Sequence, residues 1–494
     1  MAELKYKTIN SLKWSALERI FSQGIQLILM LVLARLLGPK AFGLIGMLAI
    51  FIAIGQVFID SGFSSALIRK NDRTHIDYAT AFYFNITVAI LFYVVLFFSA
   101  PLIAKFYHQP ELELLSKIIG LSLITNSFCV VPRTILTIAM DFKSQAKVSV
   151  LSVVLGGACA LFLAWKGFGV WSLVAQTLTV SMCNALLLNI ITKWIPGLFF
   201  SKKSFLYLFG FGGKLLISGL LDTIYNNMYQ IIIGKKFSAA NVGQYTQANQ
   251  ISSIPAMTLT NIIQRVTYPM FSHMQDDEDK LKKNYLLTLK LAALFIFPIM
   301  AGIGIIAQPL FFIILGPQWI DASRLIIILS FAYMIYPIHA VNLNILQVKG
   351  RSDLFLQLEI MKKLIGVIVI LITINYGIYG MCFGLVFHSY LCLIVNTYYT
   401  KKMTKLTLKQ QMIELGPVWI ITIISCTIAY IGALHISDDA LLQVLLMVVI
   451  AVALYIGLIF LLQRNLLKLA LSIRNRVYLN EKNPSNTTFF TGFK

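Results

Sequence analysis

The amino-acid sequence predicts an all-α polytopic membrane protein. Of its 494 residues, 58% are hydrophobic and only 12% are charged, and the mean hydropathy is +0.80. An ordinary soluble domain contains about 25% charged residues, so this chain is too apolar to cover itself with a solvated surface. Its apolar runs have the length of about 20 residues that an α-helix needs to cross a bilayer. The alternating strands typical of a membrane β-barrel are absent from the sequence.

Fourteen apolar segments are long enough to cross the membrane, so we expect 14 transmembrane helices. The first has no small-residue cleavage site of the kind that follows a signal peptide, and we expect it to remain as a helix. No long loop is expected on the outer side of the membrane, which argues against a catalytic domain there. The segments begin near residues 14, 41, 80, 116, 147, 169, 207, 242, 286, 323, 357, 378, 415 and 440.

Basic residues set the expected orientation. The formal net charge is +21, and the lysines and arginines gather in alternate short loops, such as residues 5–13, 69–73 and 401–409. By the positive-inside rule these loops and both termini are cytoplasmic. Because the positive charge lies in short loops and not along one exposed face, nucleic acid is not an expected partner.

A weak internal repeat predicts two related halves. ARLLGPKAFGLIG (residues 34–46) aligns with GKKFSAANVGQYT (residues 234–246) at an offset of 200 and pairs Gly43 with Gly243. Since six helices bring the chain back to the same side, both halves keep one orientation, as in parallel-repeat transporters. The expected organisation is an N-lobe of helices 1–6 (residues 1–200), a pseudo-symmetric C-lobe of helices 7–12 (residues 201–405), two C-terminal helices (residues 406–464) and a cytoplasmic tail (residues 465–494).

Polar side chains form a stripe on the first expected helix. At 100° per residue, the polar residues from Ser15 to Gln26 fall within an arc of about 140°, and they include the adjacent charges Glu18 and Arg19. A charge in the bilayer costs roughly 2.5–3.5 kcal/mol on insertion scales, so we expect this face to meet a partner or water. Arg35 projects from the opposite face near the outer end, where we expect it to reach lipid headgroups.

Polar stripes on the helices expected near residues 207 and 242 favour a shared hydrated cavity. For a single serine or glutamine, hydrogen bonding between helices is the simpler explanation, but here the polar residues concentrate on equivalent helices of two repeats. Cations in such a cavity suit phosphate, and its acids suit a coupling proton or cation. The predicted substrate-binding residues are Arg19, Gln23, Gln26, Lys214, Asn226, Gln250, Asn261 and Arg265, and the candidate coupling-ion residues are Glu18, Asp60 and Asp222.

No signature of an enzyme or of a cofactor site occurs in the sequence. It contains no Walker lysine motif, no HExxH, no GxSxG and no zinc-ligand spacing of cysteine and histidine. We therefore expect a protein that is not an enzyme and that holds no cofactor or metal. All six cysteines fall in apolar stretches, where a thiol behaves as a small hydrophobic group, so no disulfide framework is expected.

The segments SLKWSALERIFSQGIQLILMLVLARLLGPKAFGLIGML (residues 11–48) and VTYPMFSHMQDDEDKLKKNY (residues 266–285) resemble the polysaccharide flippases. These are the Wzx-type branch of the multidrug/oligosaccharidyl-lipid/polysaccharide exporter superfamily, and the chain is similar to its colanic and teichuronic acid exporters. The turn RLLGPKAFG (residues 35–43) is the most specific part of the likeness, which extends over nearly the whole chain.

The resemblance implies two six-helix lobes around a central cavity that opens alternately to the two sides of a bacterial plasma membrane. It implies a substrate in which an oligosaccharide is attached through pyrophosphate to a polyprenol, with Arg19, Lys214 and Arg265 as candidates for holding the headgroup. Membrane lipids and the polysaccharide polymerase and export machinery are the implied partners. Related lipid II flippases of fourteen helices use the last two as a groove for the lipid tail, so helices 13 and 14 are candidates for that role.

Other functions of the same chain remain open at this point. A multidrug or organic-cation antiporter, or a lipid II flippase, of the same superfamily is the alternative. An antiporter predicts a binding site dominated by acids, and the basic residues expected in the cavity count against it. A membrane glycosyl ligase or polymerase requires a large outer loop with catalytic residues, and none is expected.

Overall fold

The structure of the protein is a computed structural model that describes residues 2–464, with side chains described for Trp14 and for residues 21–464. Every regular element in this range is a helix, and no strand occurs in it. The predicted all-α class is therefore confirmed. The expected cytoplasmic tail, residues 465–494, lies outside the described residues.

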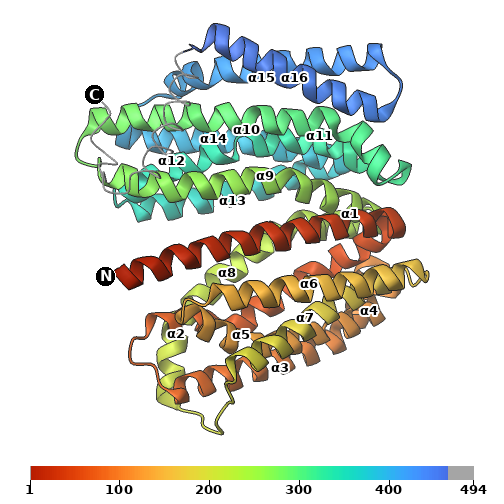
Figure 1. Cartoon of the computed structure of the whole chain (residues 1–494), viewed down its shortest axis with the longest axis vertical. Helices are drawn as coiled ribbons and strands as arrows, with labels where there is room; N and C mark the ends of the chain where they lie inside the picture. The colour runs from red at the N-terminus through yellow and green to blue at the C-terminus, as the bar shows by residue number, and fades with distance from the viewer. Residues whose placement is uncertain (1, 465–494) are drawn as a thin grey trace. The chain divides into compact units, whose positions relative to one another are not determined.

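The chain divides into two compact units, and unit 1 comprises Met1–Thr246 and Ile314–Trp319. Side-chain caps fix where several of its helices begin. For example, the side chain of Ser201 accepts a hydrogen bond from the backbone N–H of Ser204 at the start of α8, which satisfies one of the N–H groups that a helix start leaves unpaired. The α-helices of unit 1, labelled in Figure 1, are α1 (Ala2–Asp60), α2 (Phe63–Arg69), α3 (His75–Tyr107), α4 (Glu111–Ile119), α5 (Leu121–Ile138), α6 (Phe142–Trp165), α7 (Trp171–Thr192), α8 (Lys202–Lys236) and the start of α9 (Ala239–Ser272). The unit also contains the short 3₁₀ helix η1 (Pro317–Trp319).

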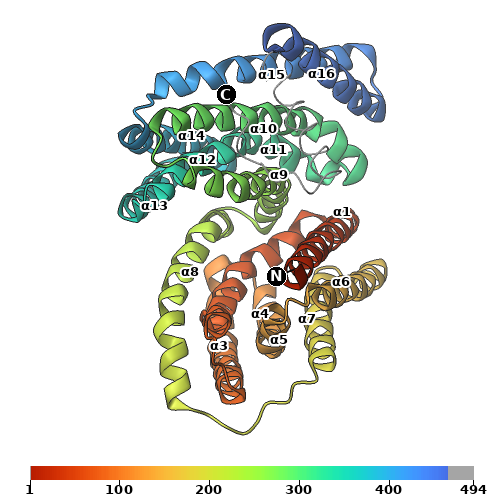
Figure 2. The ribbon, with the colours of Figure 1, turned by 60° about the vertical axis from the view of Figure 1, so that its left-hand side comes forward.

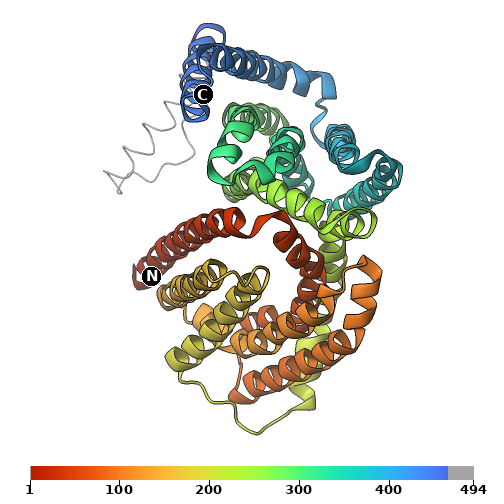
Figure 3. The same cartoon turned by 90° about the vertical axis from the view of Figure 1, so that its right-hand side faces the viewer.

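α1 contains a break that separates two membrane-length segments. Gly38 has φ 74° and ψ 175°, a conformation that glycine adopts without steric cost. The next residue, Pro39, lacks the N–H that a continuous helix would need. The chain changes direction at this point (Figure 3), close to the start of the second helix that the sequence predicts near residue 41.

α8 is held in unit 1 by its contacts with α1, α2 and α3, and it runs alongside α3 in Figure 2. An apolar cluster that includes Phe63 of α2, Phe82 of α3 and Leu208 of α8 fixes this arrangement. Because compact units follow packing and not sequence repeats, the predicted lobe boundary at residue 200 stays a prediction.

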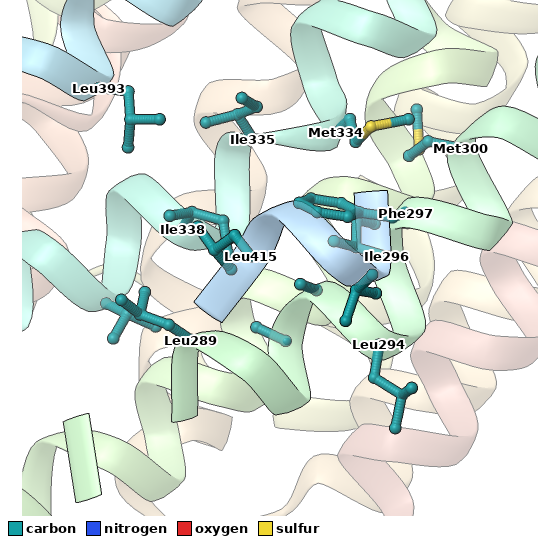
Figure 4. Close-up of a cluster of buried hydrophobic side chains, with 14 of the residues drawn as sticks. Leu289, Leu294, Ile296, Phe297, Met300, Met334, Ile335, Ile338, Leu393 and Leu415 are labelled. Atoms are coloured by element: carbon teal, nitrogen blue, oxygen red, sulfur yellow. The ribbon is translucent and has the colours of Figure 1, made fainter. Parts of the chain in front are cut away.

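Unit 2 comprises Gln247–Ile313 and Ile320–Lys494. Its core is built on α10, whose side chains Leu289, Phe297 and Met300 pack with Ile338 and Leu415 from later helices (Figure 4). The helices of unit 2 are the rest of α9, α10 (Glu278–Ile314), α11 (Ile320–Met334), α12 (Tyr336–Val348), α13 (Ser352–Thr373), η2 (Ile374–Tyr376), α14 (Gly377–Thr404), α15 (Leu408–Ile436) and α16 (Ala440–Leu462).

The last two helices, α15 and α16, pack against each other and are attached to α10. The ammonium of Lys290 lies 2.9 Å from a carboxylate oxygen of Glu414 on α15. The hydroxyl of Tyr455 on α16 donates a 2.7 Å hydrogen bond to the carbonyl of Leu294. Both helices are therefore anchored inside unit 2.

Eleven helical stretches of the described residues are long and apolar enough to cross a membrane, so the chain is a multi-pass membrane protein. Two of these stretches, Phe21–Arg69 and Ser352–Thr404, are 49 and 53 residues long, much longer than the roughly 20 residues that one crossing needs. The first contains the break at Gly38, and the second contains Gly377, which also has φ 74°. The eleven stretches do not include α9.

The two glycines paired by the sequence repeat touch each other in unit 1. A Cβ atom on Gly43 would lie 1.6 Å from the carbonyl oxygen of Ala239, and one on Gly243 would lie 2.0 Å from the carbonyl oxygen of Pro39. The two contacts are reciprocal, because Ala239 is offset from Pro39 by the same 200 residues. Contacts of this reciprocal kind form where a two-fold axis relates two surfaces.

Candidate functional site

Unit 1 contains a polar pocket of about 810 Å³ between α1, α2, α5, α7 and α8. This volume is within the range of about 300–1,000 Å³ that is usual for small-molecule sites. Its polar lining includes Gln56 and Asp60 from α1, Asn126 and Arg133 from α5, and Asn184 from α7. Charged and amide side chains inside an otherwise apolar helical unit make this pocket the candidate site.

A sharp corner between α1 and α2 places Asp60 at the pocket. Gly62 has φ 70°, and a Cβ atom on it would lie 2.8 Å from the Cα of Gly212 on α8. Only glycine permits both this backbone conformation and this close approach. The Asp60 carboxylate accepts a 2.6 Å hydrogen bond from the hydroxyl of Ser64, the second residue of α2.

Helical spacing brings the polar residues of α5 to the pocket. Asn126 and Arg133 are seven residues apart, and Thr137 follows four residues later, so all three lie on one face. All three line the pocket. The sequence shows Asn126 and Arg133 as polar residues of one expected helix, seven residues apart, but they are not among the predicted substrate-binding or coupling-ion residues.

Several polar groups of the pocket have hydrogen-bonding capacity to spare. Among the described residues, the guanidinium of Arg133 and the side-chain amides of Gln56 and Asn126 have no hydrogen-bond or ion-pair partner. The side-chain carbonyl of Asn184 is buried and also unpaired there. An arginine offers five N–H donors and an amide offers two donors and one acceptor oxygen, so the pocket can bind a ligand rich in hydroxyl or anionic oxygens.

The structure places one predicted site residue, Asp60, at this pocket. The side chains of Glu18 and Arg19 lie outside the described residues. The predicted residues of α8 do not line the pocket, although Leu215 and Gly219 of the same helix do. The other predicted residues have exposed side chains: Gln23 and Gln26 on α1, Lys214, Asp222 and Asn226 on α8, and Gln250, Asn261 and Arg265 on α9.

No metal or redox centre is formed by the described residues. All six cysteines are unpaired. No group of three or more histidine, cysteine, aspartate or glutamate residues is arranged to hold a metal ion in the part of the chain that the structure describes. The chemistry of the pocket therefore rests on hydrogen bonds and on the charges of Asp60 and Arg133.

Comparison with known proteins shows what this chain is similar to. The chain is 25% identical over 401 residues to the lipopolysaccharide biosynthesis protein WzxC of Escherichia coli (strain K12), with 80% of each chain covered. It is 25% identical over 356 residues to the teichuronic acid biosynthesis protein TuaB of Bacillus subtilis (strain 168), covering 72% of this chain and 74% of TuaB.

A solved structure shares the fold. The lipid II flippase MurJ in an inward closed conformation superposes with a TM-score of 0.72 and 13% sequence identity, covering 93% of this chain and 100% of MurJ. Residues 32–324 match the model of the family described as polysaccharide biosynthesis protein. The match spans more than half of the chain, and the chain therefore belongs to this family, as a Wzx-type polysaccharide flippase of the exporter superfamily that its sequence resembles.

Proposed function

We propose that the protein moves a polyprenyl-pyrophosphate-linked oligosaccharide repeat unit from the cytoplasmic to the outer leaflet, by alternating access, for the biosynthesis of a surface polysaccharide. The observation that carries this proposal is the polar pocket of unit 1, with its unpaired amides and guanidinium. The family and the relatives named for lipopolysaccharide and teichuronic acid biosynthesis support the class of substrate.

The pocket matches the chemistry of an oligosaccharide headgroup. Moving unpaired hydroxyls into hydrocarbon costs several kcal/mol for each group, so a headgroup crosses only where protein or water replaces its hydrogen bonds. Gln56 and Asn126 both donate and accept, Asp60 accepts, and Arg133 suits a carboxylate or phosphate oxygen. Sugar hydroxyls and an acidic substituent would therefore be satisfied in the pocket.

The predicted cations and acids complete the proposed mechanism. Arg19, Lys214 and Arg265 hold the pyrophosphate, while the predicted amides on α1, α8 and α9 bind sugars. Glu18, Asp60 and Asp222 are the proposed coupling-ion residues. Rocking of two six-helix lobes carries the headgroup across while the polyprenyl chain stays in lipid. The polysaccharide polymerase and export machinery then receive the product.

The proposed topology has fourteen spans with both termini in the cytoplasm of a bacterium. Division of the two long stretches at Gly38 and Gly377, with α9 counted as a span, gives this number. α9 has 34 residues and therefore rises about 51 Å at 1.5 Å per residue, enough to cross. The reciprocal contact of Gly43 with Gly243 supports the pseudo-two-fold relation of the halves.

The test is translocation of a fluorescent polyprenyl-pyrophosphate-linked oligosaccharide in liposomes that contain the purified protein. We expect Arg133→Gln to lower the rate about tenfold, because one charge-assisted hydrogen bond contributes about 1.5–3 kcal/mol. Arg324→Gln is the matched control, because Arg324 is an exposed arginine of α11 that does not line the pocket. Equal rates for the wild type and Arg133→Gln contradict the role of the pocket, and a wild type that does not flip this lipid contradicts the function.

A further inference from the structure

A second, apolar groove of about 470 Å³ lies in unit 1 between α1, α3 and α8. The lining atoms are almost all hydrocarbon, and the lining residues are Ile50, Phe51 and Ile54 of α1, Ser99, Leu102, Ile103, Phe106 and Tyr107 of α3, and Ile224 and Ile231 of α8. The pocket with Asp60 and Arg133 shares none of these residues. The groove therefore suits an apolar part of a ligand, whereas the polar pocket suits a polar part.

The mouth of the groove is exposed and apolar. Leu102, Phe106 and Ile224 line it, with exposed fractions of 68%, 42% and 45%. At 100° per residue, Ile224 lies about 160° around α8 from both Asp222 and Asn226. The groove thus opens on the side of α8 that is turned away from its polar stripe.

The ammonium of Lys235 lies at one end of this apolar groove. The ammonium of Lys235 donates a 2.7 Å hydrogen bond to the carbonyl of Phe106 and lies 4.7 Å from the centre of the Phe106 ring. Since an ammonium has three N–H donors, this hydrogen bond leaves two for a ligand. Lys235 is exposed, so an anion can approach it.

A hydroxyl at the same end also lacks a partner. Tyr107 lines the groove and is only 3% exposed, and its hydroxyl makes no hydrogen bond with any described residue. A buried hydroxyl without a partner is destabilising. An oxygen-rich ligand end bound beside Lys235 would give this hydroxyl a partner.

We propose that the groove binds the polyprenyl chain of the lipid carrier, with the carrier's phosphate beside Lys235. The proposal rests on the proposed function, whose topology puts the C-terminal ends of α3 and α8 on the outer side of the membrane. The groove is then the place where the chain lies after its headgroup has crossed. Because residues 224–231 rise only about 10 Å, the groove holds the units of the chain nearest the phosphate.

The substrate's own chain is the favoured occupant over an acyl chain of bulk lipid. A carrier whose headgroup is already bound by the protein is tethered, and tethering raises the effective concentration of its chain at a neighbouring groove to the millimolar range. Aromatic side chains of Phe51, Phe106 and Tyr107 line the groove, and flat rings give a branched chain many close dispersion contacts.

The experiment is photocrosslinking of the full-length protein in phosphatidylcholine nanodiscs with a diazirine-bearing farnesyl phosphate. We expect crosslinks at residues 99–107 and 224–231. Ile224→Trp, which fills the groove, should lower their yield about tenfold, and Lys235→Gln should lower it about fivefold. Crosslinks confined to α15 and α16 overturn the proposal.

Two matched variants control for nonspecific effects. Val95→Trp adds the same ring at a 61% exposed position of α3 outside the groove, and Lys166→Gln removes a lysine that lies over the ring of Trp165 away from it. Both should crosslink like the wild type. Excess undecaprenyl phosphate should remove the crosslinks, whereas equal competition by phosphatidylglycerol identifies a general lipid site and overturns the proposal.

Binding and transport are separated by measuring both on each variant. A wild type that binds the probe in the groove but does not flip the lipid-linked oligosaccharide contradicts the proposed function and leaves the groove assignment standing. A wild type that flips, with Ile224→Trp crosslinking as strongly as Val95→Trp, contradicts the groove assignment alone.

Discussion

The contact between Gly43 and Gly243 leaves no room for a single methyl group. In Gly43→Ala the new Cβ atom would lie 1.6 Å from the oxygen and 2.5 Å from the carbon of the Ala239 carbonyl. Both are backbone atoms, so no side-chain rotation relieves the clash. The two helices must separate by about 1.4 Å before the shorter contact reaches 3.0 Å, the lower limit for real Cβ contacts.

The expected cost follows from two opposing effects. Overpacking costs about 1–3 kcal/mol when backbone must shift, and replacing glycine by alanine within a helix returns about 0.8–1 kcal/mol. A Cβ atom 1.6–2.0 Å from a backbone oxygen is a severe clash, so the overpacking cost falls in the upper half of this range, about 2–3 kcal/mol. The net loss in Gly43→Ala and in Gly243→Ala is therefore about 1–2 kcal/mol. In thermal unfolding in detergent, this loss should lower the midpoint by about 2–4 °C.

A matched control isolates the clash from helix propensity. Gly210 lies inside α8, and a Cβ atom on it would meet nothing within 4 Å, so Gly210→Ala should keep or raise the midpoint. In the double variant with Gly43→Ala and Gly243→Ala, both clashes lie at the same helix contact, so a single outward shift of one helix relieves both. Its cost should therefore be smaller than the sum of the single costs by at least about 0.5 kcal/mol. Additive costs, or a Gly43→Ala variant as stable as Gly210→Ala, would refute this explanation.

Two further predictions concern buried polar contacts of unit 1. Asp77 is fully buried, and its carboxylate lies 2.8 Å from the ammonium of Lys70, so Asp77→Ala should lower the free energy of unfolding by about 3–5 kcal/mol. Lys40→Ala, which removes the exposed ion pair of Lys40 with Glu111, should cost less than about 1 kcal/mol. Equal losses in thermal unfolding would contradict this ranking. The indole N–H of the fully buried Trp319 donates a 2.9 Å hydrogen bond to the carbonyl of Ala34. Trp319→Phe removes this donor and should lower the free energy of unfolding by about 1–3 kcal/mol. An unchanged unfolding midpoint would contradict this and show that water replaces the donor.

The sequence predicts the helices well where a start or stop has a local cause. The pair Gly38 and Pro39 ends one segment and begins the next with no help from the rest of the chain. The break has a tertiary consequence that the sequence does not reveal. It leaves backbone carbonyls unpaired at the end of the first segment, and distant side chains satisfy them. Gln318 donates to the carbonyl of Arg35, and Trp319 donates to that of Ala34.

Arg35 itself shows what a local interpretation leaves out, although its predicted approach to headgroups stays a prediction. From its position near the outer end of an apolar helix, we expect its guanidinium to reach lipid headgroups. In the structure it donates a 3.1 Å hydrogen bond to the carbonyl of Ile314 at the end of α10. Hydropathy identifies the end of a helix, but it does not reveal which other helix ends are nearby.

The candidate site was only partly predictable for the same reason. Periodicity identifies the polar face of one helix, and Asp60 is found in this way. Asn126 and Arg133, which line the pocket together with Asp60, come more than sixty residues later in the chain. Which faces meet depends on how α1, α5 and α8 pack, and the close approach of Gly62 to Gly212 is one of the contacts that set this packing.

Whether α9 crosses the membrane decides both the number of spans and which residues can border the proposed transport path. It is too polar to be among the eleven apolar stretches, and some of its polar residues, such as Gln247 and Ser252, are buried. Its predicted site residues Gln250, Asn261 and Arg265 are exposed and lie within about 60° of one another at 100° per residue. If α9 crosses the bilayer, as proposed, this exposed face is too costly to meet lipid, and it must border water or substrate. The low hydropathy of α9 is then what a helix beside a water-filled cavity requires. The proposal of a fourteenth span therefore holds only together with the proposal of a hydrated cavity.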